Sequence, residues 1–326
     1  MAQPFRYVVQ SGRLVGQAWT PPPLRPGQVL VEVRGIGVNR ADLLQVKGLY
    51  PPPAGYDDVP GLEFSGRVVD AARTNRWRTG DRVMGLVAAG AYASHVVVDE
   101  RHLWAVPSLL RDTEAAAVPE ALTTAYLNLV WRGKLRPSEW VLVHSAAGGI
   151  GSTAVQLIRL LGGRSVGMVG SDHKAQVVQK LGAHHVFNRK EDRRQLQKRL
   201  GTLVPNGMSL ILDTVGPGWE AFHAAVSAPG GRWLLIGLLG RLSESETFPW
   251  GRFLQKELVM KASRLRNKPP EFKASLMAEI ADTVLPAYSE GWMRPVVDSV
   301  LPLDQWTTAF EKLKKGDVIG KIVLQP

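Results

Sequence analysis

The stretch VHSAAGGIGSTAVQ, residues 143–156, carries glycines at a spacing that could bind a phosphate group. It contains Ala146-x-Gly148-x-x-Gly151, a dinucleotide-binding fingerprint with alanine in place of the first glycine. Positions without side chains let the backbone approach a pyrophosphate, and the start of a helix adds free N–H groups and a positive dipole. The motif therefore predicts a pyrophosphate-binding turn. A tight turn between a strand and a helix, with no ligand, is the alternative.

Polar residues after the next apolar run indicate which dinucleotide would bind. An NAD-dependent protein usually places Asp or Glu about 20 residues beyond the motif, where the carboxylate binds the ribose 2′-hydroxyl. This sequence has Gly170 and Ser171 there, with Lys174 one helical turn later and Arg189 after the third strand. Asp172 argues the other way because it could bind the ribose, but we interpret it as the N-cap of a helix. The pattern favours NADPH over NADH.

The elements that would position these residues follow from the hydrophobic pattern. From residue 120 to residue 262, apolar runs of strand length alternate with helical segments, which predicts a parallel sheet covered on both faces. Six strands fit a complete doubly wound unit, and they are WVLVHS, RSVGMV, HHVFN, SLILDTV, RWLLIG and ELVMKAS. Residues 1–119 instead alternate apolar and polar positions between Gly, Pro and Asp, which predicts a β-rich domain. Residues 263–326 are expected to return to that first domain.

Composition narrows the class of protein. The chain has 326 residues, a formal charge of +11 and no cysteine, which excludes disulfides and thiolate metal sites. No apolar run approaches the roughly 20 residues that span a bilayer, and the first residues do not resemble a signal peptide, so a soluble cytoplasmic protein is expected. The positive charge indicates a solvated basic surface or the attraction of an anionic cofactor or substrate, and nucleic-acid binding is the least favoured of the three interpretations.

Several blocks of the sequence carry a family resemblance. The chain resembles the zinc-free medium-chain dehydrogenase/reductases, and within them the NADPH quinone oxidoreductases and their p53-inducible branch. The blocks stand in family order, and they are GVNRADLLQVKGLYPPPAG, PGLEFSGRV, VHSAAGGIGSTAVQLIRLLG, LILDTVG, GRWLLIGLLG and IGKIVL. The resemblance implies an α/β fold with a GroES-like catalytic domain, built from both ends of the chain, around a central six-stranded Rossmann domain. It also implies a homodimer formed through the last strand of the central sheet.

The resemblance also implies which residues form the site. Asn39, Asp42 and Tyr50 would line the catalytic cleft near the nicotinamide. The residues that would contact NADPH are Thr124, Gly148, Gly149, Ile150, Gly151, Ser171, Lys174, Arg189, Val215, Gly237, Leu238, Arg266 and Lys321. Arg189 departs from the pattern because many relatives carry tyrosine there, so the stacking of the adenosine could differ.

The residues do not favour a zinc site or an esterase nucleophile. Zinc-dependent relatives place ligands where this chain has Asn39 and Leu62, and Glu63 alone is not a metal site, so no metal is expected. The stretch GRSVG matches the esterase motif Gly-x-Ser-x-Gly, but it leads into a strand and not into a helix. Ser165 is therefore not expected to be a nucleophile.

Hydride transfer with little acid–base machinery remains, since the cofactor carries the reactive hydride. The leading hypothesis is an NADPH-dependent quinone reductase. The second is a reductase of enones or enoyl thioesters, and the third is a non-catalytic NADPH-binding protein that contacts RNA. Tyr50 or water would supply the proton. The choice of substrate would depend on the loops at residues 40–60 and 240–272.

Overall fold

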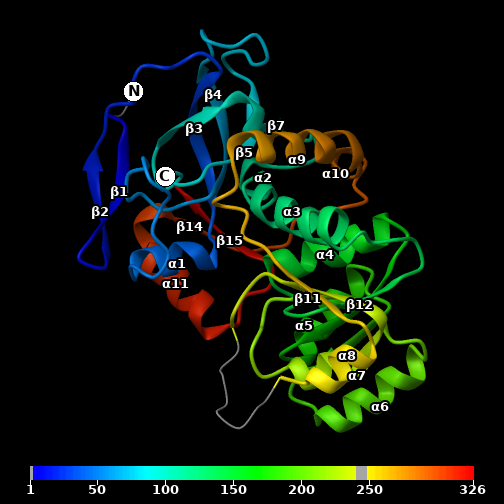
Figure 1. Cartoon of the computed structure of the whole chain (residues 1–326). Coiled ribbons are helices and arrows are strands. Elements are labelled where there is room, and N and C mark those ends of the chain that lie inside the picture. The colour runs from blue at the N-terminus through cyan, green and yellow to red at the C-terminus, as the bar shows by residue number, and fades with distance from the viewer. Residues whose placement is uncertain (1–2, 240–247) are drawn as a thin grey trace. The chain divides into compact units, whose positions relative to one another are not determined.

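The computed structural model describes residues 3–239 and 248–326, and the described chain forms two compact units. The first unit holds Met1–Thr123 and Leu265–Pro326, and the second holds Thr124–Arg264 (Figure 1). The domain limits expected from the sequence, 119/120 and 262/263, stay predictions.

The first unit contains a seven-stranded sheet that joins the two ends of the chain. Its order is β14 (Val297–Pro302), β15 (Lys321–Gln325), β3 (Gln28–Gly37), β4 (Glu63–Asp70), β5 (Arg82–Leu86) and β7 (Leu103–Ala105), and β6 (His95–Asp99) also pairs with β3. The last strand, β15, pairs antiparallel with β3. The C-terminal segment therefore completes a sheet that the N-terminal segment begins.

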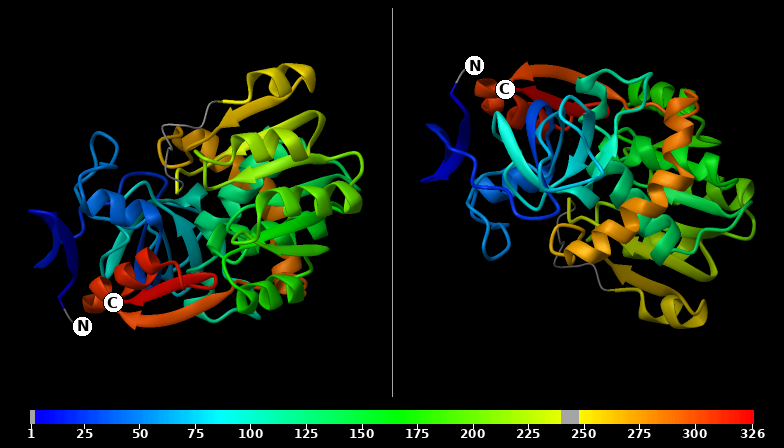
Figure 2. Two further views of the ribbon diagram at one scale, coloured as in Figure 1. Left: turned by 90° about the horizontal axis from the view of Figure 1, so that it is seen from below. Right: turned by 90° about the horizontal axis from the view of Figure 1, so that it is seen from above.

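The pattern of β3 shows why this sheet forms. Val29, Val31 and Val33 are buried, whereas the intervening Glu32 and Arg34 are at least partly exposed, as the period of two predicts. A separate hairpin, β1 (Phe5–Gln10) with β2 (Arg13–Ala18), precedes this sheet, and both views of Figure 2 draw it in dark blue.

Helices of the first unit come from both of its chain segments. They are α1 (Arg40–Val46), α2 (Asp112–Ala115), α9 (Pro270–Thr283), α10 (Leu285–Ser289) and α11 (Trp306–Lys315), with 3₁₀ turns at Glu100–His102 and Leu303–Gln305. Helix α3 (Pro119–Tyr126) runs across the limit between the units.

The second unit contains the predicted parallel sheet. Its order is β10 (His185–Asn188), β9 (Arg164–Val169), β8 (Trp140–Val143), β11 (Met208–Asp213), β12 (Ser227–Leu235) and β13 (Val259–Ala262), and every pairing is parallel. All six expected strands are present. The strand order reverses next to β8, which is where ligands bind in doubly wound sheets. The predicted fold class is confirmed.

Helices follow the strands of this sheet as expected. They are α4 (Gly149–Leu160), α5 (Asp172–Lys180), α6 (Arg193–Leu203), α7 (Glu220–Val226) and α8 (Trp250–Gln255), and a π-helical turn spans Leu127–Arg132. Helix α6 is rich in arginine and lysine, and it buries Leu196 and Leu200, so its charges face outward. Ser165 lies buried within β9, which agrees with the expectation that it is not an esterase nucleophile.

Candidate functional site

The glycine-rich turn lies at the carboxyl end of β8. Gly148 is the N-cap of α4, and its N–H donates to the carbonyl oxygen of Ser145 at 2.8 Å. A Cβ atom at Gly151 would lie 2.2 Å from that same oxygen, so no other residue fits this position without moving the backbone. The turn thus brings the N-terminal N–H groups of a 12-residue helix to the end of the strand. This geometry suits a bound phosphate.

The alanine that replaces the first glycine of the fingerprint fits for a local reason. Ala146 is fully buried, and its N–H donates to the carbonyl oxygen of Met168 on the neighbouring strand β9 at 3.0 Å. The nearby residue of β9 is Gly167, where an added Cβ would lie 3.0 Å from the Cβ of Ala146. The methyl group of Ala146 therefore fits because Gly167 has no side chain.

Ser171 and Lys174 lie at the start of α5, directly after β9. Ser171 is the N-cap of α5, and its hydroxyl accepts a hydrogen bond from the N–H of Lys174 at 3.4 Å. The expected N-cap at Asp172 is therefore wrong by one position. The extended backbone of Ser171 ends the loop, so Asp172 is the first helical residue, and its carboxylate accepts from Asn188 Nδ2 at 3.2 Å.

Arg189 belongs to the same edge of the sheet. Its backbone N–H donates to the carbonyl oxygen of Val169 at 2.8 Å, and a Cβ at Gly170 would lie 3.5 Å from its Nε atom. The absence of a side chain at 170 gives the guanidinium its place beside the end of β9. Ser171 and Lys174, at the start of α5, and Arg189, directly after β10, thus all belong to segments at the carboxyl edge of the sheet.

A buried histidine pair at this edge was not predicted from the sequence. His144, directly after β8, lies with its Nε2 atom 2.8 Å from Nε2 of His223 in α7. Burial, helped by the charges of Arg189 and Arg193, lowers the pKa of His144 to about 3. Burial also lowers the pKa of His223 well below its usual value, so both rings are neutral at pH 7. The partners lie 79 positions apart, and no local motif connects them.

The loop after β11 is held by the neighbouring carboxylate. Asp213 accepts from the N–H groups of Val215 at 2.8 Å and Gly216 at 2.9 Å, and its second oxygen lies 3.8 Å from Nδ1 of His223. Burial raises the pKa of Asp213 to about 6. Thr214 donates to the hydroxyl of Ser145 at 2.9 Å, so this loop is tied to the glycine-rich turn.

Three other predicted cofactor residues, Gly237, Leu238 and Thr124, lie in loops and helices around the sheet of the second unit. Gly237 follows β12, where a Cβ would lie 2.9 Å from the carbonyl oxygen of Thr214, and the side chain of Leu238 is exposed. The carbonyl oxygen of Thr124 accepts from Asn128 in the π-helical turn at 2.8 Å. Of the loop at 240–272, residues 240–247 lie outside the described part of the chain.

In the first unit, Asn39 belongs to a buried polar cluster. Its Nδ2 atom donates to Glu63 Oε1 at 2.9 Å, and its Oδ1 atom accepts from the Lys321 ammonium at 2.6 Å. Lys321 also donates to the carbonyl oxygen of Val38 at 2.8 Å and lies 2.6 Å from Glu63 Oε1. These contacts use all three N–H groups of Lys321, so a contact with a cofactor would have to replace one of them.

Asp42 fixes the backbone around the same cluster. It is fully buried and accepts from the N–H groups of Asn39 at 2.7 Å and Gly61 at 3.2 Å, and from the hydroxyl of Tyr92 at 3.2 Å. Burial raises the pKa of Asp42 to about 6. The carboxyl group therefore holds the start of α1 against the loop before β4.

Tyr50 and Arg266 come together within the first unit. The Arg266 guanidinium donates to the carbonyl oxygen of Tyr50 at 3.0 Å and lies 5.1 Å from the centre of the phenol ring. Sequence reasoning named both residues but did not connect them.

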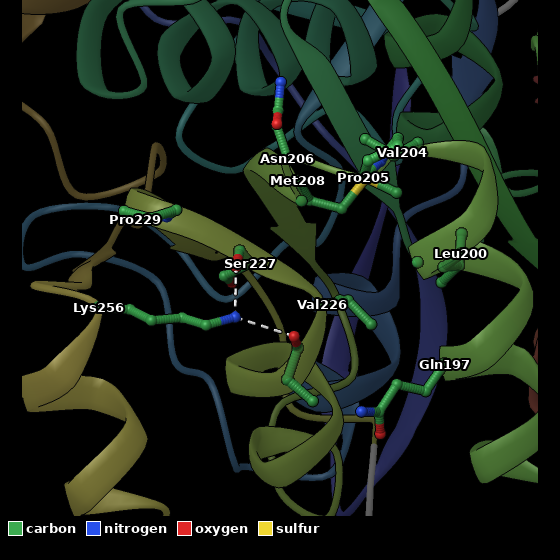
Figure 3. Close-up of a pocket in the computed structure, with 13 residues that line it drawn as sticks. Gln197, Leu200, Val204, Pro205, Asn206, Met208, Val226, Ser227, Pro229 and Lys256 are labelled. Carbon is green, nitrogen blue, oxygen red and sulfur yellow. Dashed lines mark hydrogen bonds between the residues drawn. The ribbon is translucent and has the colours of Figure 1, made fainter.

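The second unit also has a groove of about 300 Å³ at the amino ends of β11 and β12 (Figure 3). Leu200, Val204 and Met208 line it together with Lys256, whose ammonium donates to the carbonyl oxygens of Ala225 at 2.9 Å and Ser227 at 2.6 Å. That ammonium therefore binds the carbonyl end of α7. Ligands of parallel sheets bind at the opposite edge, and none of the predicted site residues lines this groove.

Comparison with known proteins shows which family the chain belongs to. Residues 25–108 match the family model described as alcohol dehydrogenase GroES-like domain, and residues 149–282 match the one described as zinc-binding dehydrogenase. A bovine protein named quinone oxidoreductase-like protein 2 is 30% identical over 95% of this chain and 88% of its own length. The chain belongs to the medium-chain dehydrogenase/reductase family. It is an oxidoreductase of that superfamily.

Two further matches show the range of this family. A rat synaptic vesicle membrane protein VAT-1 homolog is 29% identical over all of this chain and 85% of its own length. The crystal structure of Escherichia coli quinone oxidoreductase complexed with NADPH superposes on this chain with a TM-score of 0.85. The sequences are 26% identical, and the match covers 99% of each chain. The narrower likeness to the p53-inducible branch stays a prediction.

One family model is described as zinc-binding, but the described residues of this chain form no zinc site. Within residues 3–239 and 248–326, His, Asp and Glu do not gather in a group of three or more that could hold a metal ion. Glu63 is instead met by the Lys321 ammonium, the Asn39 amide and the backbone N–H of Glu120. The described helices also include none with the length and hydropathy to cross a membrane.

Proposed function

We propose that this dehydrogenase/reductase is an NADPH-dependent reductase that transfers hydride to a quinone or a similar conjugated carbonyl compound. The observation that carries the proposal is the turn at Gly151, where the backbone leaves no room for a Cβ beside a helix N-terminus. Bound NADPH would supply the hydride. The proposed contacts with the cofactor are those that the family resemblance implies, except Arg266, whose guanidinium already binds Ala88, Tyr50 and Gln45.

The donor set after β9 and β10 supports the preference for NADPH. The hydroxyl of Ser171, the ammonium of Lys174 and the guanidinium of Arg189 suit the dianionic 2′-phosphate better than a neutral ribose hydroxyl. Asp172, the one acidic residue at this point, has a carboxylate oxygen that accepts from Asn188. The carboxylate is thus already part of a protein hydrogen bond.

The experiment that tests cofactor choice is the substitution Lys174→Ala. Loss of a charge-assisted hydrogen bond of about 1.5–3 kcal/mol should weaken NADPH binding roughly 10- to 100-fold. NADH binding should stay nearly unchanged, because NADH has no 2′-phosphate. Titration of each cofactor by fluorescence measures both dissociation constants. Lys180→Ala, at the exposed end of the same helix, is the matched control, and equal losses for NADPH and NADH would contradict the assignment.

The acceptor is tested by the oxidation of NADPH in a panel of compounds. Ortho- and para-quinones should be reduced faster than simple enones and enoyl thioesters. Faster turnover of the alkenes would favour the second function, alkene reduction, for which Tyr50 would be the proton donor. No turnover with any acceptor, together with salt-sensitive retention of RNA, would favour a non-catalytic NADPH-binding protein.

We propose further that the protein is cytoplasmic and that two copies form a dimer through β13. The support for the dimer is an edge strand that pairs with β12 alone in the described part of the chain. The small-molecule acceptor is the partner expected besides NADPH, and nucleic acid and membranes are not expected partners.

A further inference from the structure

The guanidinium of Arg266 is buried although its three hydrogen-bond acceptors are neutral. The residue is 4% exposed, and burial lowers its pKa. It donates to the carbonyl oxygens of Ala88 at 2.6 Å and Tyr50 at 3.0 Å, and to Oε1 of Gln45 at 2.6 Å. A buried cation without a directly bonded anion costs free energy. The charges of Asp42, Glu120 and Asp58 offset part of this cost from a distance, since none of them is a hydrogen-bond acceptor of the guanidinium.

The three acceptors belong to different segments of the first unit. Ala88 follows β5, Gln45 lies in α1 and Tyr50 lies in the loop after α1, and these positions are 178, 221 and 216 residues from Arg266 in the sequence. Gln45 in turn donates to the carboxylate of Asp58 at 2.7 Å. One planar cation therefore binds the first part of the loop at residues 47–58 directly, at Tyr50, and reaches its end at Asp58 through Gln45. At that end Arg6 also pairs with Asp57, and the N–H of Val9 donates to the carbonyl oxygen of Asp58.

This loop has little apolar packing of its own. Residues 47–58 are all described, and none of them is buried. Leu49 on one side of Tyr50 is 70% exposed, and three prolines, 51–53, follow on the other side. Polar contacts must therefore hold the loop, since segments with few buried contacts open at low free-energy cost.

Arg266 fixes the ring of Tyr50 as well as its backbone. The guanidinium carbon lies 5.1 Å from the ring centre, within the range of a cation–π contact, while an N–H group of the same guanidinium binds the Tyr50 carbonyl oxygen. Two contacts from one rigid group set both the position and the orientation of the phenol. Lysine could not reproduce this geometry, because its ammonium is a point charge.

We propose that Arg266 is the positioning residue for Tyr50, and that it holds the phenol where the conjugated acceptor binds. This inference rests on the proposed function, and it assigns Arg266 a role in acceptor binding and not primarily in cofactor binding. Arg266 acts through Tyr50 and does not itself react.

The first test needs no activity. Hydrogen–deuterium exchange of the cofactor-free protein should show faster exchange at residues 47–58 in Arg266→Met than in the wild type. Outside this loop, only the segments around the other two acceptors, Gln45 and Ala88, should change in the first unit. Arg266→Lys should give an intermediate rate. The control is Arg264→Met, because the Arg264 side chain is exposed. Faster exchange throughout the first unit would instead mean general destabilisation and would overturn the proposal.

The second test distinguishes an effect of Arg266 on the acceptor from an effect on NADPH binding. Arg266→Met should lower kcat/KM for a para-quinone roughly 100-fold, as expected when a binding group is misplaced by about 1 Å, and Kd for NADPH should change little. In a Tyr50→Ala background, Arg266→Met should lower kcat/KM little further, because the two residues act as one unit. Weaker NADPH binding with additive losses would overturn the positioning role. If the wild type reduces no acceptor, the proposed function fails, while the exchange experiment still decides the contact.

Discussion

The phenol of Tyr50 is the group of the predicted site that we expect to donate a proton to the acceptor oxygen. If it does, Tyr50→Phe should lower the rate with enones and enoyl thioesters by the roughly 10²- to 10⁴-fold typical of a lost general acid. Quinones should be much less affected, because the anion formed from them is more stable and can take its proton from water. Steady-state rates with one acceptor of each class measure this difference.

The ring of Tyr50 should matter for both classes of acceptor. Tyr50→Ala removes the surface that Arg266 orients, so it should reduce quinone turnover more than Tyr50→Phe does. If Tyr50→Phe has no effect with any acceptor, Tyr50 only lines the cleft and water supplies the proton.

The buried histidine pair predicts an acid-sensitive contribution to stability. In the unfolded chain a histidine binds a proton below its ordinary pKa of 6.5, whereas folded His144 stays neutral down to a pKa of about 3. The unfolded state therefore binds more protons between these values, and the contribution of His144 to stability is lost as the pH falls. Asp42 and Asp213 act in the opposite sense between their ordinary pKa of 3.8 and about 6, because their folded forms hold protons there.

The contribution of His144 is measured as the difference in unfolding free energy between the wild type and His144→Gln. Relative to the wild type, His144→Gln should gain stability as the pH falls from 6.5 toward 4, by about 1.4 kcal/mol for each pH unit. Urea unfolding of both proteins at several pH values gives this slope. A difference in unfolding free energy that does not vary with pH would show that His144 titrates normally in the folded protein.

At the scale of elements, the close approach of α4 to the end of β8 depends on Gly151. A methyl group there would lie 2.2 Å from Ser145 O and 2.7 Å from the Cα of Ala146, and both are backbone atoms. Gly151→Ala should therefore cost about 1–3 kcal/mol of stability and displace the phosphate-binding turn. We expect the loss of NADPH binding to exceed the loss of stability, which calorimetry and cofactor titration measure separately.

Gly201→Ala in α6 is the matched control for that substitution. No heavy atom lies within 4 Å of a Cβ at Gly201, and the residue sits within a helix. This change should raise stability slightly, because alanine favours the helix by about 1 kcal/mol over glycine. Destabilisation at 201 comparable to that at 151 would mean that the close contact is not the cause.

The elements themselves were largely predictable, whereas their contacts were not. The six strands of the second unit are apolar runs between glycines and polar residues, and a local pattern suffices to find them. The pairing of His144 with His223, and that of Arg266 with Tyr50, joins positions 79 and 216 residues apart. Periodicity carries no information on such partners. The cap of α5 was misplaced because serine and aspartate both favour that position, and backbone conformation decides between them.

At the scale of the whole molecule, each sheet has an edge strand with exposed apolar residues. In the second unit β13 exposes Val259 and Met260, and α8, next to it in the sequence, exposes Trp250 and Leu254. In the first unit the edge strand β14 exposes Val300. An open strand edge with apolar side chains favours pairing with another strand, so either edge could join two chains.

The apolar surface is larger around β13, and we therefore expect the dimer to form there. A lysine at 260 would place a charge within the joined sheet, so Met260→Lys should shift the protein from dimer to monomer. Val300→Lys, which puts the same charge on the other edge strand, should leave the dimer intact. Light scattering after size-exclusion chromatography gives the mass of each variant, and the wild type should have twice the mass of one chain. A monomeric Val300→Lys with a dimeric Met260→Lys would place the interface at β14 instead, and a monomeric wild type would exclude both edges as interfaces.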